Sequence, residues 1–332
     1  MWGTRYIVSV RYFMLKKFIG RLFYIIPAKP NTAQIAVTNI CNFNCPMCQR
    51  FDLKVDIKHM EAQMFEQILE KIKDVPNIIL TSWGEPLTHP QLFDFIKKSA
   101  KSHKVRLTSN GALLDETKAQ ELLISGLDAI TFSVDTLDEK ESYGHPLKEQ
   151  IKNIEYFAKL NFEAGTPVKI FLQTVFLKYD KNNFHEIVEF AKKNKINRIR
   201  LTRVDQRFND YARPSQEEEK KLVKFLEKEL KGSKVGLDFL PYVAFDGLFR
   251  IIFKIVYPLL HRFGKFCLRT FDDVYINERG EVTPCCSLPN LNCGNILESD
   301  LQTIWQSEKF KNFRQNQEKY CGKCDILKIK IK

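Results

Sequence analysis

From residue 33 to about residue 240, short runs of apolar and β-branched residues alternate with longer amphipathic runs. Such alternation predicts βαβ units, in which helices cover a parallel sheet. Six strand–helix units are two fewer than a closed eight-fold barrel needs, so we expect an α/β fold with an open, partial (β/α)6 TIM-like barrel. The strands are predicted at 33–38, 78–82, 105–109, 129–134, 168–175 and 198–203. The helices are predicted at 61–73, 91–102, 115–125, 148–160, 183–194 and 215–231.

The carboxy-terminal part of the chain has a different pattern. Residues 273–286 predict a β-hairpin that turns at Glu278–Gly280, and a short helix is expected around 300–316. These elements predict a small, Cys-rich α+β module appended to the barrel. The domains expected are 1–30 (a basic segment), 31–240 (the barrel), 241–265 (an apolar connection) and 266–332 (the module).

The amino-terminal segment is basic and apolar. The first 51 residues contain seven Lys or Arg and no acid, so they supply more than half of the net charge of +12. Residues 5–26 predict an amphipathic helix lying on an anionic membrane surface, because basic residues interrupt the apolar run too often for a span. A helix capping the barrel and a mitochondrial transit peptide are the alternatives. Residues 242–263 are again apolar with spaced basic residues, and they predict a hydrophobic patch, an apolar substrate entrance or a core helix.

Nine cysteines are more than an ordinary cytosolic protein of 332 residues carries. Their clustered spacing indicates metal or redox ligation in a reducing compartment rather than a secreted disulfide framework. We therefore expect a cytoplasmic protein, with peripheral attachment to the inner face of the membrane through the basic segment.

Three of these cysteines, Cys41, Cys45 and Cys48, form a C-x3-C-x2-C run directly after the first predicted strand. Three thiolates can hold one face of an iron–sulfur cluster, and no fourth Cys or His lies in the run to complete the site. One iron then remains open to a small molecule. A zinc site is the alternative, but zinc takes four ligands, and His59 and His89 are poorly placed to complete the set.

Three further motifs follow the next strands: Trp83–Pro86, Thr108–Gly111 and Ser133–Asp135. Together with the cysteine run, this ordered set resembles the radical S-adenosylmethionine (SAM) superfamily over roughly residues 33–210. Two positions depart from the family pattern. Met47 replaces the usual aromatic residue before the third cysteine, and Trp83 replaces the first Gly of a Gly-Gly-Glu-Pro motif.

The resemblance implies a [4Fe–4S] cluster on the three cysteines, with SAM chelating the open iron. It implies that Glu85 accepts from the methionine ammonium, that Gly84 allows close backbone approach, and that Ser133 and Asp135 bind ribose. Strand-end turns are the alternative for the polar positions. The full set of expected cofactor contacts is Gly84, Glu85, Asn110, Ser133, Asp135 and Gln173.

Four cysteines near the carboxyl end resemble the SPASM extension of radical SAM enzymes in its shortened, twitch form. They are Cys267, Cys285, Cys321 and Cys324. The resemblance implies one auxiliary [4Fe–4S] cluster with four protein ligands, which suits electron transfer. A zinc ribbon is the alternative. Cys286 and Cys293 are not part of this set; either could replace one of the four as a ligand, and the alternative is that both are ordinary thiols.

The resemblance predicts a radical SAM enzyme that reductively cleaves SAM to a 5′-deoxyadenosyl radical and abstracts hydrogen from a small or amphiphilic substrate, lipid-linked substrates included. Flavodoxin or ferredoxin is the expected electron donor. A maturase acting on a peptide or protein side chain, and an iron–sulfur electron-transfer protein, are the alternatives. No catalytic acid or base can be assigned. A nucleic-acid partner is not expected, since the charge outside the first 51 residues is +5 (12 minus 7).

Overall fold

The computed structural model describes residues 26–51, 57–165, 168–204, 211, 213–239, 267, 269–321 and 324. Their strands form one ten-stranded sheet in the order β10-β9-β8-β1-β2-β3-β4-β5-β6-β7. Neighbouring strands from β1 to β7 are parallel, and β8 is also parallel to β1. The order closes no ring, because β7 and β10 lie at opposite ends of the sheet. The expected open partial barrel is confirmed.

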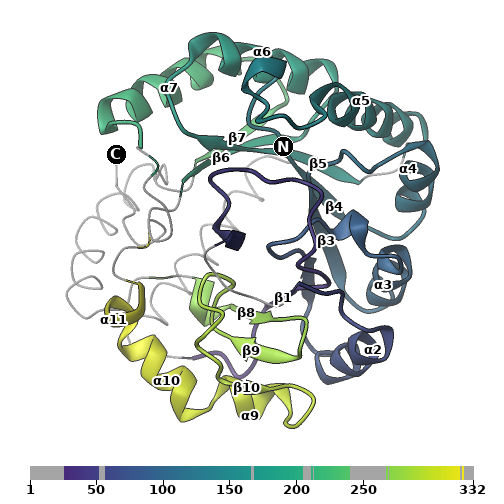
Figure 1. Ribbon diagram of the computed structural model, residues 1–332, viewed down its shortest axis with the longest axis vertical. Helices are drawn as coiled ribbons and strands as arrows, with labels where there is room; N and C mark the ends of the chain where they lie inside the picture. The colour runs from purple at the N-terminus through teal and green to yellow at the C-terminus, as the bar shows by residue number, and fades with distance from the viewer. Residues whose placement is uncertain are drawn as a thin grey trace, which may run out of the picture.

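The six predicted βα units are all present. The sheet curves, with the helices outside it and the chain that follows β1 inside the arc (Figure 1). The strands are β1 (Thr32–Ile35), β2 (Asn77–Leu80), β3 (Lys104–Ser109), β4 (Ala129–Ser133), β5 (Lys169–Phe176) and β6 (Arg198–Arg203). The helices are α2 (Ala62–Lys71), α3 (Leu92–Ser99), α4 (Glu116–Leu123), α5 (Leu147–Glu163), α6 (Lys181–Lys193) and α7 (Gln216–Glu229).

Helix starts follow from local capping chemistry. The side chain of Asp115 accepts from the backbone N–H of Lys118 at the start of α4, and Asp180 caps α6 in the same way. Ser215 and Glu218 form a reciprocal capping box at α7. These caps satisfy backbone donors that the helix itself leaves without partners, which fixes where each helix begins.

Strand β7 (Gly236–Phe239) follows α7 and extends the sheet beyond the six predicted units. Its four residues include Gly236 and Asp238, so it lacks the apolar and β-branched pattern that reveals the other strands. Parallel pairing with β6 supplies its order instead, and an ion pair between Arg198 of β6 and Asp238 joins the two strands.

The predicted carboxy-terminal hairpin is β8 (Asp273–Ile276) and β9 (Glu281–Thr283), which pair antiparallel. Gly280 closes the turn with a φ of +77°, a conformation that favours glycine. The short strand β10 (Gly294–Asn295) pairs with β9. Because β8 also pairs in parallel with β1, the hairpin continues the barrel sheet, a pairing that the hairpin pattern does not reveal.

The single helix expected at 300–316 is two helices, α9 (Leu301–Trp305) and α10 (Glu308–Gln315), and α11 (Gln317–Cys321) follows. The break falls at Ser307, whose side chain accepts from the N–H of Phe310 and begins a new helix. Trp305 and Phe310 are fully buried and belong to the same hydrophobic core as the barrel strands. The carboxy-terminal helices therefore pack on the barrel's own core.

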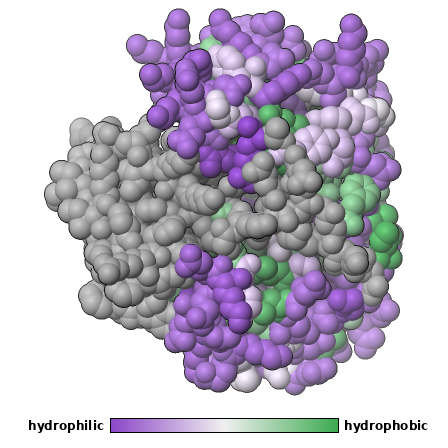
Figure 2. Space-filling model, turned by 60° about the vertical axis from the view of Figure 1, so that its left-hand side comes forward, coloured by the Kyte–Doolittle hydropathy of each residue, from purple (hydrophilic) through white to green (hydrophobic). Residues whose placement is uncertain are grey.

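The basic helix expected at residues 5–26 and the apolar segment at 242–263 fall, apart from Ile26, outside the described residues. Among the described helices, none is both long enough and apolar enough to cross a membrane. On the side shown in Figure 2, the described surface is mainly hydrophilic above and below, as the charged residues of α7 and α10 lead one to expect.

Candidate active site

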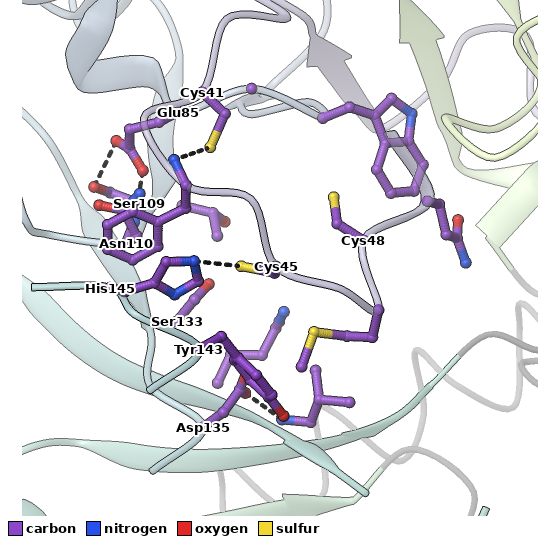
Figure 3. Close-up of a pocket in the computed structure, with 18 of the residues that line it drawn as sticks. Cys41, Cys45, Cys48, Glu85, Ser109, Asn110, Ser133, Asp135, Tyr143 and His145 are labelled. Carbon is purple, nitrogen blue, oxygen red and sulfur yellow. Dashed lines mark hydrogen bonds between the residues drawn. The ribbon is translucent and has the colours of Figure 1, made fainter. Parts of the chain in front are cut away.

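One cavity of about 410 Å³ lies at the carboxyl ends of the parallel strands. Cys41, Cys45 and Cys48 line it, on the loop that follows β1 (Figure 3). All the predicted cofactor contacts line the same cavity: Gly84, Glu85, Asn110, Ser133, Asp135 and Gln173. Residues from β1, β2, β3, β4 and β5 therefore meet at one site, as the carboxyl-end rule predicts.

The cysteine loop has a defined shape. The N–H of Cys48 donates to the carbonyl of Cys45 at 3.0 Å, and the N–H of Phe43 points to the Cys41 sulfur at 3.4 Å. The Arg50 guanidinium donates to the Phe43 carbonyl at 2.9 Å and to the Asn44 side chain at 3.0 Å. These bonds give the loop a shape in which the three half-buried thiols line the cavity.

Two of the three thiols, Cys41 and Cys45, have raised pKa values. Desolvation raises the pKa of Cys41, and desolvation together with the nearby Asp135 carboxylate raises the pKa of Cys45 to about 12. Iron binds thiolates, so loading the site must release these protons. The donor set, three thiols on one short loop facing a cavity, fits one face of a [4Fe–4S] cluster.

Gly84 is required by close backbone packing. A Cβ added there would lie 2.5 Å from the Thr38 carbonyl oxygen and 2.6 Å from that of Ile40. The neighbouring N–H of Glu85 donates to the same Ile40 carbonyl at 2.8 Å. The loop after β2 therefore lies directly against the chain that leads into Cys41, and only glycine allows this approach.

The Glu85 carboxylate joins the ends of two strands. One oxygen accepts from the Ser109 hydroxyl at 2.7 Å and the Leu87 N–H at 3.0 Å, and the other accepts from the Asn110 N–H at 2.6 Å. Burial raises the pKa of Glu85, and these three donors oppose the shift. Glu85 thus caps the short helix at Pro86–Thr88 while still lining the cavity.

Asn110 links the third strand to the cysteine loop. Its side-chain amide donates to Asn42 at 2.9 Å, and its side-chain oxygen accepts from the Ala112 N–H. Gln150 of α5 donates to the carbonyls of Asn110 at 2.7 Å and Ser133 at 2.8 Å. The sequence reading missed both Asn42 and Gln150. The signal for Gln150 was a polar residue on the buried face of an amphipathic helix.

Ser133, Asp135 and Gln173 lie together on one wall of the cavity. Ser133 is paired directly with Gln173 across β4 and β5. One Asp135 oxygen accepts from the Val175 N–H at 2.8 Å. Desolvation raises the pKa of Asp135 to about 6, so the carboxyl is ionised at neutral pH. These polar groups are placed to receive hydroxyl donors such as those of a ribose.

Tyr143 and His145, on the loop after β4, also line the cavity and lie beside Asp135 and Ser133 in Figure 3. The His145 ring stacks on Phe43 with centroids 4.0 Å apart, and its Nε2 lies 4.0 Å from the Cys45 sulfur. Desolvation lowers the pKa of His145 and raises that of Tyr143 to about 12, which keeps both neutral. Arg203 also lines the cavity and is ion-paired with the buried Glu219.

The two departures from the family pattern also line the cavity. Met47 is 8% exposed, so a thioether occupies the place of the usual aromatic ring. The Trp83 indole N–H donates to the carbonyl of Cys286 at 3.1 Å. Trp83 therefore contacts the carboxy-terminal module, which its sequence position does not reveal.

A second cavity, of about 40 Å³, holds the carboxy-terminal thiols. Burial raises the pKa of Cys267, and the hydrogen bond to Cys285 followed by desolvation raises that of Cys286. Cys293 does not line this cavity, because its sulfur points to the carbonyl of Leu291 within the main core. The thiols that line the cavity are the four predicted ones, Cys267, Cys285, Cys321 and Cys324, together with Cys286. This donor set fits an auxiliary iron–sulfur cluster.

Comparison with protein families agrees with this geometry. Residues 35–191 match the model of the Radical SAM superfamily, and residues 267–325 match SPASM, an iron–sulfur cluster-binding domain. The first match contains the cysteine loop and the predicted cofactor contacts. The second begins at Cys267 and includes Cys324.

Two similar proteins illustrate the range of the match. The Pyrococcus furiosus "Tungsten-containing aldehyde ferredoxin oxidoreductase cofactor-modifying protein" is 26% identical over 328 residues, covering 88% of this chain and 86% of that protein. The GTP 3′,8-cyclase of Campylobacter fetus is 32% identical over 168 residues, which cover 48% of this chain and 51% of the cyclase.

Solved structures share the fold. Streptococcus suis SuiB bound to S-adenosylmethionine superimposes with a TM-score of 0.70 at 19% identity, over 95% of this chain and 75% of SuiB. The structure of anSMEcpe with bound AdoMet gives a TM-score of 0.63 at 16% identity, over 90% of this chain and 88% of that one. The radical SAM domain implies a [4Fe–4S] cluster and SAM as cofactors, and the SPASM domain implies an auxiliary iron–sulfur cluster. This chain therefore belongs to the radical SAM superfamily and carries a carboxy-terminal SPASM domain.

Proposed function

We propose that this protein is an enzyme that reductively cleaves SAM to a 5′-deoxyadenosyl radical and abstracts hydrogen from a small substrate. The observation that carries the proposal is that Cys41, Cys45 and Cys48 line one cavity together with all the predicted SAM contacts. When bound, the cluster supplies the electron that cleaves the sulfonium of SAM.

The protein's own residues orient the reactants in this proposal. The three cysteines hold the cluster at the cavity edge, and the Gly84–Glu85 backbone shapes the pocket for the methionine end of SAM. Ser133 and Asp135 accept from the ribose hydroxyls. The rings of Tyr143 and His145 line the cavity near Asp135 and Ser133, where they limit the entry of water.

A small substrate is favoured on two grounds. A cavity of about 410 Å³ that also receives SAM leaves limited room, enough for a compact molecule or one side chain. One relative, which matches 88% of this chain, is named as a cofactor-modifying protein. Two further proposals rest only on the sequences of residues 5–26 and 242–263. The first is that the substrate is amphiphilic or lipid-linked, and the second is that the protein is cytoplasmic and attaches peripherally to the membrane.

The auxiliary site completes the proposed organisation. Residues 31–240 form the catalytic barrel and residues 266–332 a twitch-type module with one cluster on Cys267, Cys285, Cys321 and Cys324. These four cysteines would hold a cluster suited to electron transfer, with flavodoxin or ferredoxin as the outside donor. Residues 1–30 and 241–265 serve as the surface anchor and the apolar connection.

The test is 5′-deoxyadenosine release by anaerobically reconstituted protein given SAM and dithionite. The proposal expects release from the wild type and none from C41A, with C293A as the matched cysteine control that keeps activity. If wild-type protein that holds about eight irons per chain released no 5′-deoxyadenosine, the proposal that it is a SAM-cleaving enzyme would be wrong. A second assay adds either a lipid extract or a candidate peptide and identifies any modified molecule by mass spectrometry. Faster 5′-deoxyadenosine release with the lipid extract supports a small or amphiphilic substrate, whereas faster release with the peptide supports the maturase alternative.

A further inference from the structure

The two cavities share a wall. Ser82, Trp83 and Ser287 line the cavity of the first cysteine loop, whereas Tyr275 and Cys286 line the auxiliary cavity. Cys286 and Ser287 are adjacent in the chain, so the wall between the two sites is a single turn of backbone. The loop after β2 lies against it.

Two hydrogen bonds fasten this loop to the auxiliary side. The Trp83 indole N–H donates to the Cys286 carbonyl at 3.1 Å, and the Tyr275 and Ser82 hydroxyl oxygens are 2.6 Å apart. Ser82 donates in turn to the side-chain oxygen of Asn39 at 3.2 Å, so Tyr275 is the donor in the shared bond. Burial raises the pKa of Tyr275, which keeps its phenol protonated for that role.

The same loop is fastened to the SAM side. Asn39 is buried and lies two residues before Cys41. Gly84 follows Trp83 directly and packs against the backbone of residues 38–40, and the N–H of Glu85 donates to the Ile40 carbonyl. A displacement of the auxiliary wall would therefore pull on the residues that shape the methionine end of the first cavity.

We propose that Ser82 and Trp83 are positioning residues that couple occupancy of the auxiliary site to SAM binding. This inference rests on the proposed function, in that the first cavity binds SAM. With a cluster bound, Cys285 and the other auxiliary thiols would fix the position of the Cys286–Ser287 backbone. The hydrogen bonds from Trp83 to Cys286 and from Tyr275 to Ser82 would then restrict the loop that carries Gly84 and Glu85. Coupling of this kind is reciprocal, so SAM stabilises the auxiliary cluster by the same factor.

The first experiment is a double-mutant cycle on SAM affinity, measured by anaerobic titration calorimetry on wild type, C324A, W83F and the double variant. C324A removes an auxiliary thiol, and W83F keeps an aromatic ring while removing the indole N–H. We expect C324A to weaken SAM binding about five-fold or more in the wild-type background and less than about two-fold in the W83F background. Equal weakening in both backgrounds, or none in either, overturns the coupling.

The matched control is W305F. The Trp305 N–H also donates to one backbone carbonyl, that of Pro27 at 2.8 Å, but Trp305 lines neither cavity. W305F should leave the C324A effect at its wild-type size. If the wild type binds no SAM, the proposed function itself is wrong. If the wild type binds SAM but C324A has the same effect on SAM affinity in the wild-type and W83F backgrounds, only the coupling is wrong.

A second measurement needs no change to the cysteines, in case C324A fails to fold. Iron is extracted from the full protein by a chelator, and its loss from the auxiliary site is followed by electron paramagnetic resonance. SAM should slow this loss in wild type and W305F, and should slow it clearly less in W83F, which keeps only the bond between Tyr275 and Ser82. Equal slowing in W83F, or no slowing in wild type, contradicts the proposal.

Discussion

Asp135 shows how a carboxylate in the cavity wall is held at a cost to stability. Its pKa is raised from 3.8 to about 6, because desolvation in the cavity wall disfavours the charge more than the Val175 N–H supports it. The folded protein therefore binds this proton more tightly than the unfolded chain does. The contribution of Asp135 to stability falls as the pH rises through the window between these two values, and the cost of the charge is complete above it.

D135N should remove that cost while keeping the acceptor for Val175. We expect its melting temperature to exceed that of wild type at pH 8, with a difference that shrinks as the pH is lowered through about 6. SAM affinity at pH 8 should fall about ten-fold, since a charged acceptor for ribose is lost. D300N is the control of opposite sign, because hydrogen bonds from Thr303 lower the pKa of the exposed Asp300. A D135N difference that does not depend on pH would contradict the account.

At the scale of single residues, the sequence placed the polar groups at strand ends correctly but could not show how they bond to one another. Every predicted contact lines the cavity because residues that follow parallel strands must meet at one edge. Gln150 was missed because its role depends on how α5 lies across β3 and β4. The bond from Trp83 to Cys286 joins residues 203 positions apart, and no local pattern encodes it.

At the scale of elements, the loop after β2 is the part of the site with the least freedom. Gly84 has backbone atoms of residues 38–40 within 2.8 Å of where a Cβ would stand, and backbone cannot move aside as a flexible side chain can. The sequence predicts most strands and helices because each type has a characteristic spacing of apolar residues. It does not predict short elements such as β7, which are ordered by pairing with a neighbouring strand.

G84A should displace the chain leading into Cys41 and prevent assembly of the first cluster. We expect iron content to fall from about eight to about four atoms per chain, with SAM binding weakened beyond measurement and the auxiliary cluster retained. G232A is the matched control: a Cβ there meets no atom within 4 Å, and the only penalty is its positive φ of +80°, about 1 kcal/mol of stability. Full iron loading of G84A would show that the close packing is not required.

At the scale of the whole molecule, barrel and carboxy-terminal module form one structure. Strand β8 pairs with β1, the first barrel strand, while Trp305 and Phe310 complete the barrel's core. The sequence predicted a small module appended to the barrel but not the strand pairing between them, because cysteine spacing and a hairpin are local signals, whereas pairing between Thr32 and Asp273 is not. This union places the auxiliary thiols one backbone turn from the SAM cavity, which is why we expect the two sites to influence each other.

The central claim is that Cys41, Cys45 and Cys48 hold a cluster whose open iron binds SAM. The most direct test is the electron paramagnetic resonance spectrum of dithionite-reduced C321A/C324A protein, which lacks the auxiliary cluster, before and after SAM is added. We predict one reduced [4Fe–4S] signal that shifts when SAM binds, and no such signal after the further change C45A. A signal that SAM leaves unchanged would contradict the account.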